Sequence, residues 1–277
     1  MINDLYTKTA NKIIFSLFSE YISRNSVFKN IHKGEECYIV GNGGSLKYMD
    51  LSSFNNKVVI GCNNLFLHKN FSDLKCKYYQ IPAPFFFFKY KNFKYKNKWQ
   101  RNYFNDMYRK KIIDNKNTLF FTSILNINFR AKNVFYEHNF GNRKPEIDKY
   151  DLSGGFSFME GSLASMLGLA IYMGFNKAVL VGVDYTFSPS IVEHFFADLT
   201  TIHNEREILH YRADFFEMVQ KKMELLTITL DGGKSSLLDY MSYSDYFGVE
   251  QVYHENYDLV DASDLSLISV YDYNNIS

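Results

Sequence analysis

The sequence predicts an α/β fold built on a doubly wound, mainly parallel sheet. Three short runs of β-branched and aromatic residues, 37–40, 57–62 and 77–81, follow one another at intervals of about 20 residues, and polar or turn residues close each run. A fourth run, 178–184, is almost continuously apolar, which is typical of a parallel strand buried on both faces. We therefore expect strands whose carboxyl ends lie side by side at one edge of the sheet.

The remaining elements follow from local patterns along the chain. Further strands are expected at 119–123, 134–136 and 226–231, each rich in strand-forming residues. Residues 163–173 are predicted to form a helix, because small and apolar residues run unbroken to Gly174, the position of a C-cap glycine. An irregular loop is expected over 188–206 and a helix over 207–225.

The domain organisation is expected to be simple. Apolar residues recur at helical spacing within 5–31, so residues 1–34 are predicted to form an amphipathic helix that precedes the main domain. No internal repeat or Pro/Gly-rich linker divides the rest, and residues 35–277 are expected to form a single domain.

Two segments have unusual charge. Residues 85–111 contain nine basic residues interleaved with aromatic ones and opposed only by Asp106. This composition fits a nucleic-acid stripe, a solvated element with one buried face, or a contact with anionic lipid or a lipid-linked glycan. Of these, the lipid contact is the hypothesis we favour. From residue 231 onward there are many acidic residues, and Lys234 is the only Lys or Arg. This acidic tail is expected to pack on the basic segment of a neighbouring subunit in a homo-oligomer, or to be a solvated face.

Overall composition excludes several classes of protein. The 277 residues include 31 Lys+Arg and 30 Asp+Glu, so the net charge of +1 argues against a protein that coats nucleic acid, and we expect no nucleic-acid partner. No run approaches the roughly 18 apolar residues of a membrane-spanning helix. The start of the chain lacks signal-peptide character, and the three cysteines show no metal-site spacing. A cytoplasmic protein is expected, with peripheral contact to the inner face of the membrane.

The chemistry is expected at the strand ends. In open α/β sheets ligands bind outside the carboxyl ends of the strands. Here those ends are rich in glycine, Asn and Asp, which bring backbone close to a phosphate and offer donors and acceptors to a nucleotide. The candidate binding residues at these ends are Gly41, Asn42, Gly43, Ser45, Asn63, Asn64 and Asp184.

Several of these residues also have a purely structural interpretation. The glycine-rich segment contains neither GxGxxG nor GxxxxGK[ST], so it can be an ordinary turn. Asn42 and Ser45 could cap a helix that begins near Leu46. Asp184 could cap the following turn or orient the pocket.

The order of these motifs resembles a known pair of families. Val40 to Leu46, Gly61 to Asn64, Gly161-Ser162 with its Ala-containing helix, and Val179 to Asp184 occur as in the bacterial sialyltransferases of glycosyltransferase family 42, the Campylobacter and Haemophilus type. The related DUF115/Maf flagellin-glycosylation proteins share the same order. The resemblance covers roughly residues 36–235.

The resemblance implies a Rossmann-like domain of GT-A type with a small lid at about 186–210. It implies a CMP-activated nonulosonic acid as donor, held at its phosphate and ribose by Asn42, Gly43 and Ser45. Asn63, with Asn64 beside it, would contact the nucleotide, and Ser162 would touch the donor sugar or phosphate. A lid histidine would be the general base, and it corresponds to His203 in the sialyltransferases or to His194 in the DUF115 pattern.

The chain also departs from the sialyltransferase pattern. Met159 stands where that family has an arginine, Gly44 replaces the proline of the turn, and Ile81-Pro82 replaces Asn-Pro. Only Tyr185 represents the pair of tyrosines that assist the leaving phosphate. The donor therefore stays open among sialic acid, Kdo, legionaminic acid and pseudaminic acid.

Histidine chemistry leaves further alternatives. His is well suited to deprotonate an acceptor hydroxyl near neutral pH, and His210 is a third candidate besides His203 and His194. The same region could instead bind a metal through His194, Asp198 and His203. No DxD motif occurs in the chain, so we expect neither a metal nor any other cofactor.

Three functions are weighed against one another. The leading hypothesis is a metal-independent glycosyltransferase that moves the nonulosonic sugar from CMP to a hydroxyl of a capsule, lipopolysaccharide or flagellin glycan. The second is a DUF115-type enzyme that transfers a nucleotide or diphosphate with Mg²⁺ bound by acids such as Asp184. The third is a non-catalytic protein that binds a sugar nucleotide.

Overall fold

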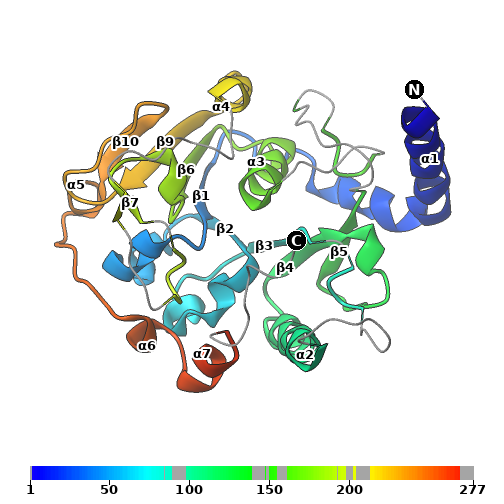
Figure 1. Cartoon of the computed structure of the whole chain (residues 1–277). Coiled ribbons are helices and arrows are strands. Elements are labelled where there is room, and N and C mark those ends of the chain that lie inside the picture. Colours follow the sequence, from blue (N-terminus) through cyan, green and yellow to red (C-terminus); the bar gives the residue numbers. More distant parts are fainter. Residues whose placement is uncertain are drawn as a thin grey trace.

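A parallel sheet forms the centre of the structure, a computed structural model that describes residues 2–83, 85–88, 98–138, 147, 150–154, 161–191, 193–197, 202–203 and 213–268 (Figure 1). Within these residues the sheet has eight strands in the order β10-β9-β6-β1-β2-β3-β4-β5, and every neighbouring pair is parallel. The predicted α/β, mainly parallel fold is confirmed. The strands are β1 (Glu36–Val40), β2 (Val58–Cys62), β3 (Tyr78–Ile81), β4 (Leu119–Ser123), β5 (Val134–Glu137), β6 (Lys177–Val181), β9 (Glu224–Thr229) and β10 (Asp239–Ser242).

The strand order reverses beside β1. Strands β1 to β5 follow one another in sequence order from β1 to one edge of the sheet. Strand β6 then pairs with β1 on its other side. The carboxyl ends of β1 and β6 diverge at such a switch point and leave a crevice there. Strand order alone therefore locates the expected ligand site.

Helices α3 (Ser162–Met173) and α4 (Ala213–Gln220) cover one face of the sheet. Ten of the twelve residues of α3 are buried, which explains why its sequence lacks a polar stripe. The helix ends at Gly174, whose φ of +87° and N–H bonds to Ala170 and Ile171 make it the predicted C-cap glycine.

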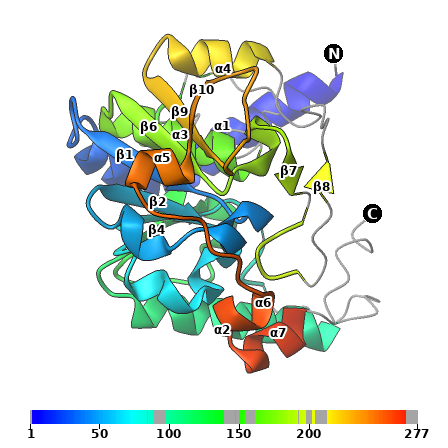
Figure 2. The ribbon, with the colours of Figure 1, turned by 90° about the vertical axis from the view of Figure 1, so that its left-hand side faces the viewer.

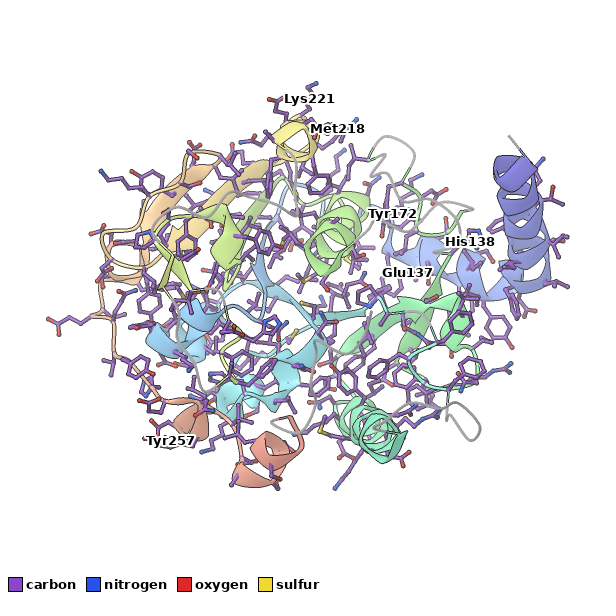
Figure 3. All side chains as sticks on the ribbon, in the orientation of Figure 1. Glu137, His138, Tyr172, Met218, Lys221 and Tyr257 are labelled. Atoms are coloured by element: carbon purple, nitrogen blue, oxygen red, sulfur yellow. The ribbon has the colours of Figure 1, made fainter. Side chains whose placement is uncertain are left out.

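The opposite face carries α2 (Lys98–Asp114), α5 (Tyr243–Phe247), α6 (Asn256–Leu259), α7 (Ala262–Ile268) and short 3₁₀ helices (Figures 1 and 2). The crossovers from β1 to β2 and from β2 to β3 use 3₁₀ helices at 44–48, 51–54, 63–67 and 69–72. Figure 3 shows side chains filling both layers.

The N-terminal residues continue into the core of the domain. Helix α1 (Ile2–Ser23) packs on the edge strand β5, and a 3₁₀ helix follows at Arg24–Phe28. Asn25 is fully buried and donates to the carbonyl oxygens of Tyr136 and Leu152 at 2.7 and 3.0 Å. The Phe28 ring packs edge-on against aromatic rings of β3, β4 and β5. Residues 24–28 therefore share one core with the sheet.

The described part of the basic segment has a structural role. The Arg109 guanidinium of α2 lies 4.7 Å from the centroid of the Phe129 ring and donates to the Phe87 carbonyl oxygen. Lys111 Nζ lies 4.0 Å from Asp264 of α7, so the acidic tail contacts the basic helix within one chain. Residues 89–97 of the segment lie outside the described residues.

Some predicted boundaries are wrong. Helix α4 ends at Gln220. Residues 224 and 225, predicted as helix, begin strand β9 instead, which buries the Leu225 side chain in the core. The N-terminal helix, predicted over 1–34, ends at Ser23. Part of the predicted irregular loop forms a short antiparallel pair, β7 (Ser190–Ile191) with β8 (Ile202–His203). None of the helices in the described ranges is both long and apolar enough to cross a membrane.

Candidate active site

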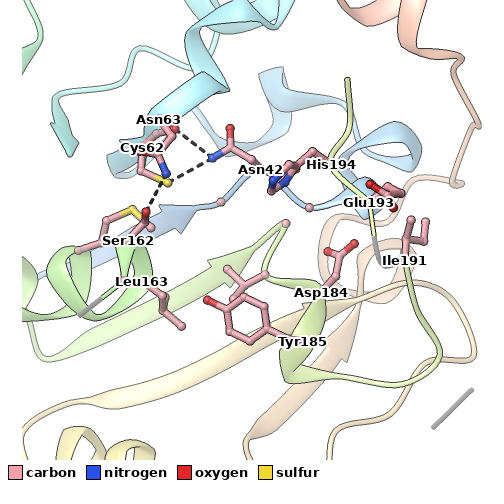
Figure 4. A pocket seen from close by; sticks show the side chains of 16 residues that line it. Asn42, Cys62, Asn63, Ser162, Leu163, Asp184, Tyr185, Ile191, Glu193 and His194 are labelled. Atoms are coloured by element: carbon pink, nitrogen blue, oxygen red, sulfur yellow. Dashed lines mark hydrogen bonds between the residues drawn. The ribbon is translucent and has the colours of Figure 1, made fainter. Parts of the chain in front are cut away.

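A pocket of about 510 Å³ opens at the switch point of the sheet. Its walls come from the loop after β1, the end of β2, the first turn of α3, the loop after β6 and the segment 191–194 (Figure 4). Of the predicted site residues, it brings together Gly41, Asn42, Gly43, Asn63, Ser162, Asp184, Tyr185 and His194. The sequence motifs therefore converge in space, as their positions at strand ends lead one to expect.

The glycine loop is held close to the end of β6. The N–H groups of Gly41 and Gly43 donate to the carbonyl oxygens of Val181 and Gly182, both at 2.8 Å. A Cβ on Gly43 would lie 2.7 Å from the Gly182 oxygen and would clash with the Asp184 carboxylate, so only glycine fits there. Because protein oxygens already accept from these N–H groups, the loop supplies a close approach of backbone to a ligand rather than a set of free donors.

The buried carboxylate of Asp184 fixes the same loop. Its two oxygens accept from the N–H of Ser45 at 2.8 Å and from the Ser45 hydroxyl at 2.5 Å. Ser45 is fully buried and does not line the pocket. The 3₁₀ helix 44–48 contains Ser45 and begins without a side-chain cap, so neither Asn42 nor Ser45 caps it, and the Ser45 hydroxyl binds Asp184 instead.

Asn42 and Asn63 form a polar wall across the pocket from Asp184 (Figure 4). Asn42 Nδ2 donates to the Cys62 carbonyl oxygen at 3.1 Å, and its Oδ1 is buried with no hydrogen-bond partner in the described part of the chain. Asn63 has φ of +49° and donates from Nδ2 to the Ser162 hydroxyl at 2.7 Å. Burial raises the pKa of the Cys62 thiol to about 12, so this cysteine is a neutral wall of the pocket.

The start of α3 adds a favourable electrostatic field. Gly161, Ser162 and Leu163 line the pocket, and the helix runs away from it for twelve residues. The N-terminal end of a helix carries partial positive charge and orients N–H groups outward. An anionic group such as a phosphate is therefore stabilised at this wall.

His194 lies at the mouth of the pocket, on a segment that pairs with the glycine loop. The backbone of His194 bridges to Gly43, and Phe195 N–H donates to the Asn42 carbonyl oxygen at 3.1 Å. His194 Nδ1 lies 3.2 Å from that same oxygen. A carbonyl oxygen only accepts, so Nδ1 carries the proton in this contact, and in the neutral ring the lone pair is then on Nε2. In its neutral form the exposed imidazole therefore has the tautomer that a general base needs.

Other predicted residues lie elsewhere or outside the described region. Asn64 is buried and accepts from the Tyr108 hydroxyl, which ties the β2 end to α2. His203 pairs through its backbone with Ser190 in β7–β8, and its side chain is not among those described. Asp198 and His210 lie outside the described residues. In the ranges that are described, no three potential ligands cluster as a metal site.

Sequence reasoning missed two polar or reactive residues of the pocket. Glu193 and Cys62 both line it. Glu193 lies next to His194 in a segment expected to be irregular, and Cys62 is the last residue of the predicted strand 57–62. A search for polar neighbours of the candidate histidines would have found Glu193.

Comparisons with known proteins give a distant likeness. No family model matches the sequence, and no curated protein matches it. Among solved structures, the sialyltransferase CstII from Campylobacter jejuni in complex with cytidine-5'-monophosphate has 16% sequence identity and a TM-score of 0.43, covering 84% of this chain and 96% of that chain. Its complex with CMP-3FNeuAc has 17% identity and a TM-score of 0.45, covering 85% and 99%. Its complex with a trisaccharide acceptor and CMP has 17% identity and a TM-score of 0.43, covering 83% and 97%.

Proposed function

We propose that this chain is a glycosyltransferase that moves a nonulosonic sugar from a CMP donor to a hydroxyl of a glycan, with His194 as the general base. The observation that carries the proposal is the meeting, in one pocket, of the glycine loop, Asn63, Ser162 and a histidine whose Nδ1 contacts the Asn42 carbonyl oxygen. The order of the same motifs in the sequence resembles the family 42 sialyltransferases.

The pocket supports binding of a nucleoside monophosphate. The phosphate is placed at the first turn of α3, where the helix dipole and the Ser162 hydroxyl favour an anion. The Asn42 Oδ1 has no hydrogen-bond partner in the described part of the chain and can accept one hydrogen bond from a ligand. We propose a ribose hydroxyl or the cytosine amino group as the donor. A volume of about 510 Å³ lies within the range of small-molecule sites, roughly 300–1,000 Å³.

The reaction then needs one proton transfer and one displacement. His194 Nε2 takes the proton of the acceptor hydroxyl, whose oxygen forms the new bond to the anomeric carbon. The bond from that carbon to the phosphate oxygen breaks, and CMP leaves with the electron pair. The Asn42 carbonyl oxygen, bound to Nδ1–H, stabilises the imidazolium that forms. Tyr185 lines the pocket and is proposed to donate to the departing phosphate.

The geometry favours a monophosphate leaving group without a metal. Both oxygens of Asp184 accept hydrogen bonds from Ser45, so this carboxylate anchors the glycine loop, and we propose this role for it instead of the Mg²⁺ role of the second hypothesis. The Glu193 carboxylate faces the same pocket and repels additional phosphate charge. We propose that no metal or other cofactor is required.

The acceptor and the cellular setting follow from the resemblance alone. We propose a capsule, lipopolysaccharide or flagellin glycan as acceptor, and action in the cytoplasm with peripheral contact to the inner face of the membrane. The donor sugar is proposed to be sialic acid or a relative such as Kdo, legionaminic or pseudaminic acid.

The test measures CMP release from a panel of CMP-nonulosonates in the presence of EDTA. His194→Ala should lower kcat by about two to four orders of magnitude while the Kd for CMP stays unchanged. His203→Ala is the matched control, and a loss confined to that variant would move the base to His203. Activity only with Mg²⁺ and a diphosphate donor would favour the second hypothesis, and CMP binding without turnover would favour the third.

A further inference from the structure

A second pocket of about 480 Å³ lies on the α5–α6 side of the molecule. It forms between the 3₁₀ segments at 48–53 and 68–70 and the C-terminal stretch 249–259 that crosses them. Its size is close to that of the candidate active site and fits a small ligand. None of its lining residues has a part in the function proposed above.

The walls combine hydrogen-bond acceptors, donors and apolar surface. Asp50, Glu250 and Asp258 contribute carboxylates, and Val252, Tyr48 and other side chains contribute apolar area. Asp50 and Asp258 each accept backbone N–H bonds within their turns, which holds the carboxylates in place. A carboxylate has about four lone-pair sites, so each keeps capacity to accept further hydroxyl groups.

His68 supplies a buried donor to this wall. Its Nδ1 accepts from the N–H of Asn70 at 3.1 Å, so the proton of the neutral ring is on Nε2. Burial lowers the pKa of His68 to about 4, and the imidazole is therefore neutral at physiological pH. Nε2 has no hydrogen-bond partner in the part of the chain that the structure describes.

The second pocket adjoins the segment that carries the proposed base. The rings of His68 and Phe195 lie 5.5 Å apart, centroid to centroid. Lys47 Nζ donates to the Ala197 carbonyl oxygen at 2.7 Å, and the Lys47 carbonyl oxygen accepts from the N–H of His254, another residue of the pocket wall. The segment 194–197 thus has the active site at one end and the second pocket behind it.

We infer that this second pocket binds a neutral saccharide, the part of a glycan acceptor remote from the reacting hydroxyl. A sugar hydroxyl donates to the carboxylates and accepts from His68, while the C–H faces of the ring contact Tyr48 and Val252. The assignment of this saccharide to the acceptor rests on the proposed function, whereas saccharide binding as such does not.

The charge of the pocket separates acceptor from donor. Three carboxylates and a neutral His68 give this wall a negative potential, which repels the carboxylate of a nonulosonic acid and the phosphate of CMP. The first pocket presents a helix N-terminus to an anion instead. The two pockets thus favour different parts of the reaction, and we expect the second to exclude the donor.

Binding is tested without any donor, by saturation-transfer NMR with lactose and maltose as neutral probes. Wild-type protein should give saturation-transfer signals from both sugars. N-acetylneuraminic acid and spermidine should give no such signals, and neither should reduce the signals of the sugars. Val252→Trp fills the pocket and should weaken the signals at least fivefold. Val27→Trp, at a residue that is 65% exposed compared with 58% for Val252, is the matched control and should leave them unchanged. Glu250→Lys, at an exposed position, is a second variant that should also weaken them.

No signal with either disaccharide, or signals that neither variant weakens, would overturn the inference. A stronger response to spermidine would reassign the pocket to cations. Transfer assays add a separate readout, in which Val252→Trp should raise KM for an oligosaccharide acceptor with kcat unchanged. If the sugars bind but no transfer occurs, the proposed function fails and saccharide binding stands.

Discussion

Glu137 makes the stability of the fold depend on pH. It ends the edge strand β5, is 1% exposed and accepts a hydrogen bond of 2.7 Å from Gln80 Nε2 on β3. Burial penalises its charged form and raises its pKa from 4.5 to about 8, although the Gln80 bond opposes the shift. At neutral pH the native state therefore holds a proton here that the unfolded chain has released.

The sign and size of the effect follow from linkage. Between pH 4.5 and 8 the native state binds more protons than the unfolded state, so stability is greatest at low pH and falls as pH rises. Each unit of difference between the two pKa values is worth about 1.36 kcal/mol. The free energy of unfolding therefore falls by about 5 kcal/mol in total from below pH 4.5 to above pH 8. This is a large part of the roughly 5–15 kcal/mol that stabilises an ordinary domain.

Glu137→Gln tests this effect, because glutamine keeps the shape and an acceptor for Gln80 but does not titrate. The free energy of unfolding is measured with urea at pH 5, 6, 7, 8 and 9. The difference between the variant and wild type should grow by several kcal/mol in favour of the variant towards pH 9. Glu224→Gln, at a side chain that is 79% exposed, should follow wild type at every pH. Parallel curves for wild type and Glu137→Gln over the whole range would refute the reasoning.

Three further predictions concern the loop, its anchor and the N-terminal segment. Gly43→Ala places a methyl group against Gly182 and Asp184 and should weaken CMP binding at least tenfold in a calorimetric titration, and an unchanged Kd would count against the loop as part of the site. Asp184→Asn removes the charge that receives both Ser45 bonds and should cost about 1–3 kcal/mol in urea unfolding, with no loss contradicting its anchoring role. Phe28→Ala removes a ring buried among β3, β4 and β5 and should cost about 3–5 kcal/mol, whereas a near-neutral result would show that residues 24–28 do not stabilise the domain.

The parallel sheet could be predicted because its strands carry their own signals. Runs such as 178–184 are apolar on both faces, and glycine or polar residues mark where each ends. Strand β10 gives no such signal, since three of its four residues are exposed at the edge of the sheet. The 3₁₀ crossovers were also missed, because segments of four or five residues are too short to show a helical period.

The candidate site was predictable in position but not in its internal contacts. The polar ends of β1, β2 and β6 placed Asn42, Asn63 and Asp184 at one edge of the sheet. The bond between Ser45 and Asp184 joins residues 139 apart, which no local pattern reveals. The proposal of His194 rather than His203 as the base likewise rests on the contact of His194 with the Asn42 carbonyl oxygen, which joins residues far apart in the sequence.

The central claim is that the pocket at the β1–β6 switch point binds CMP through the glycine loop and Asn42. A calorimetric titration of wild-type protein and Asn42→Ala with CMP, in EDTA, tests it most directly. The account predicts measurable binding by wild type without metal and at least tenfold weaker binding by the variant. Equal affinity of the two proteins, or no binding by wild type, would contradict it.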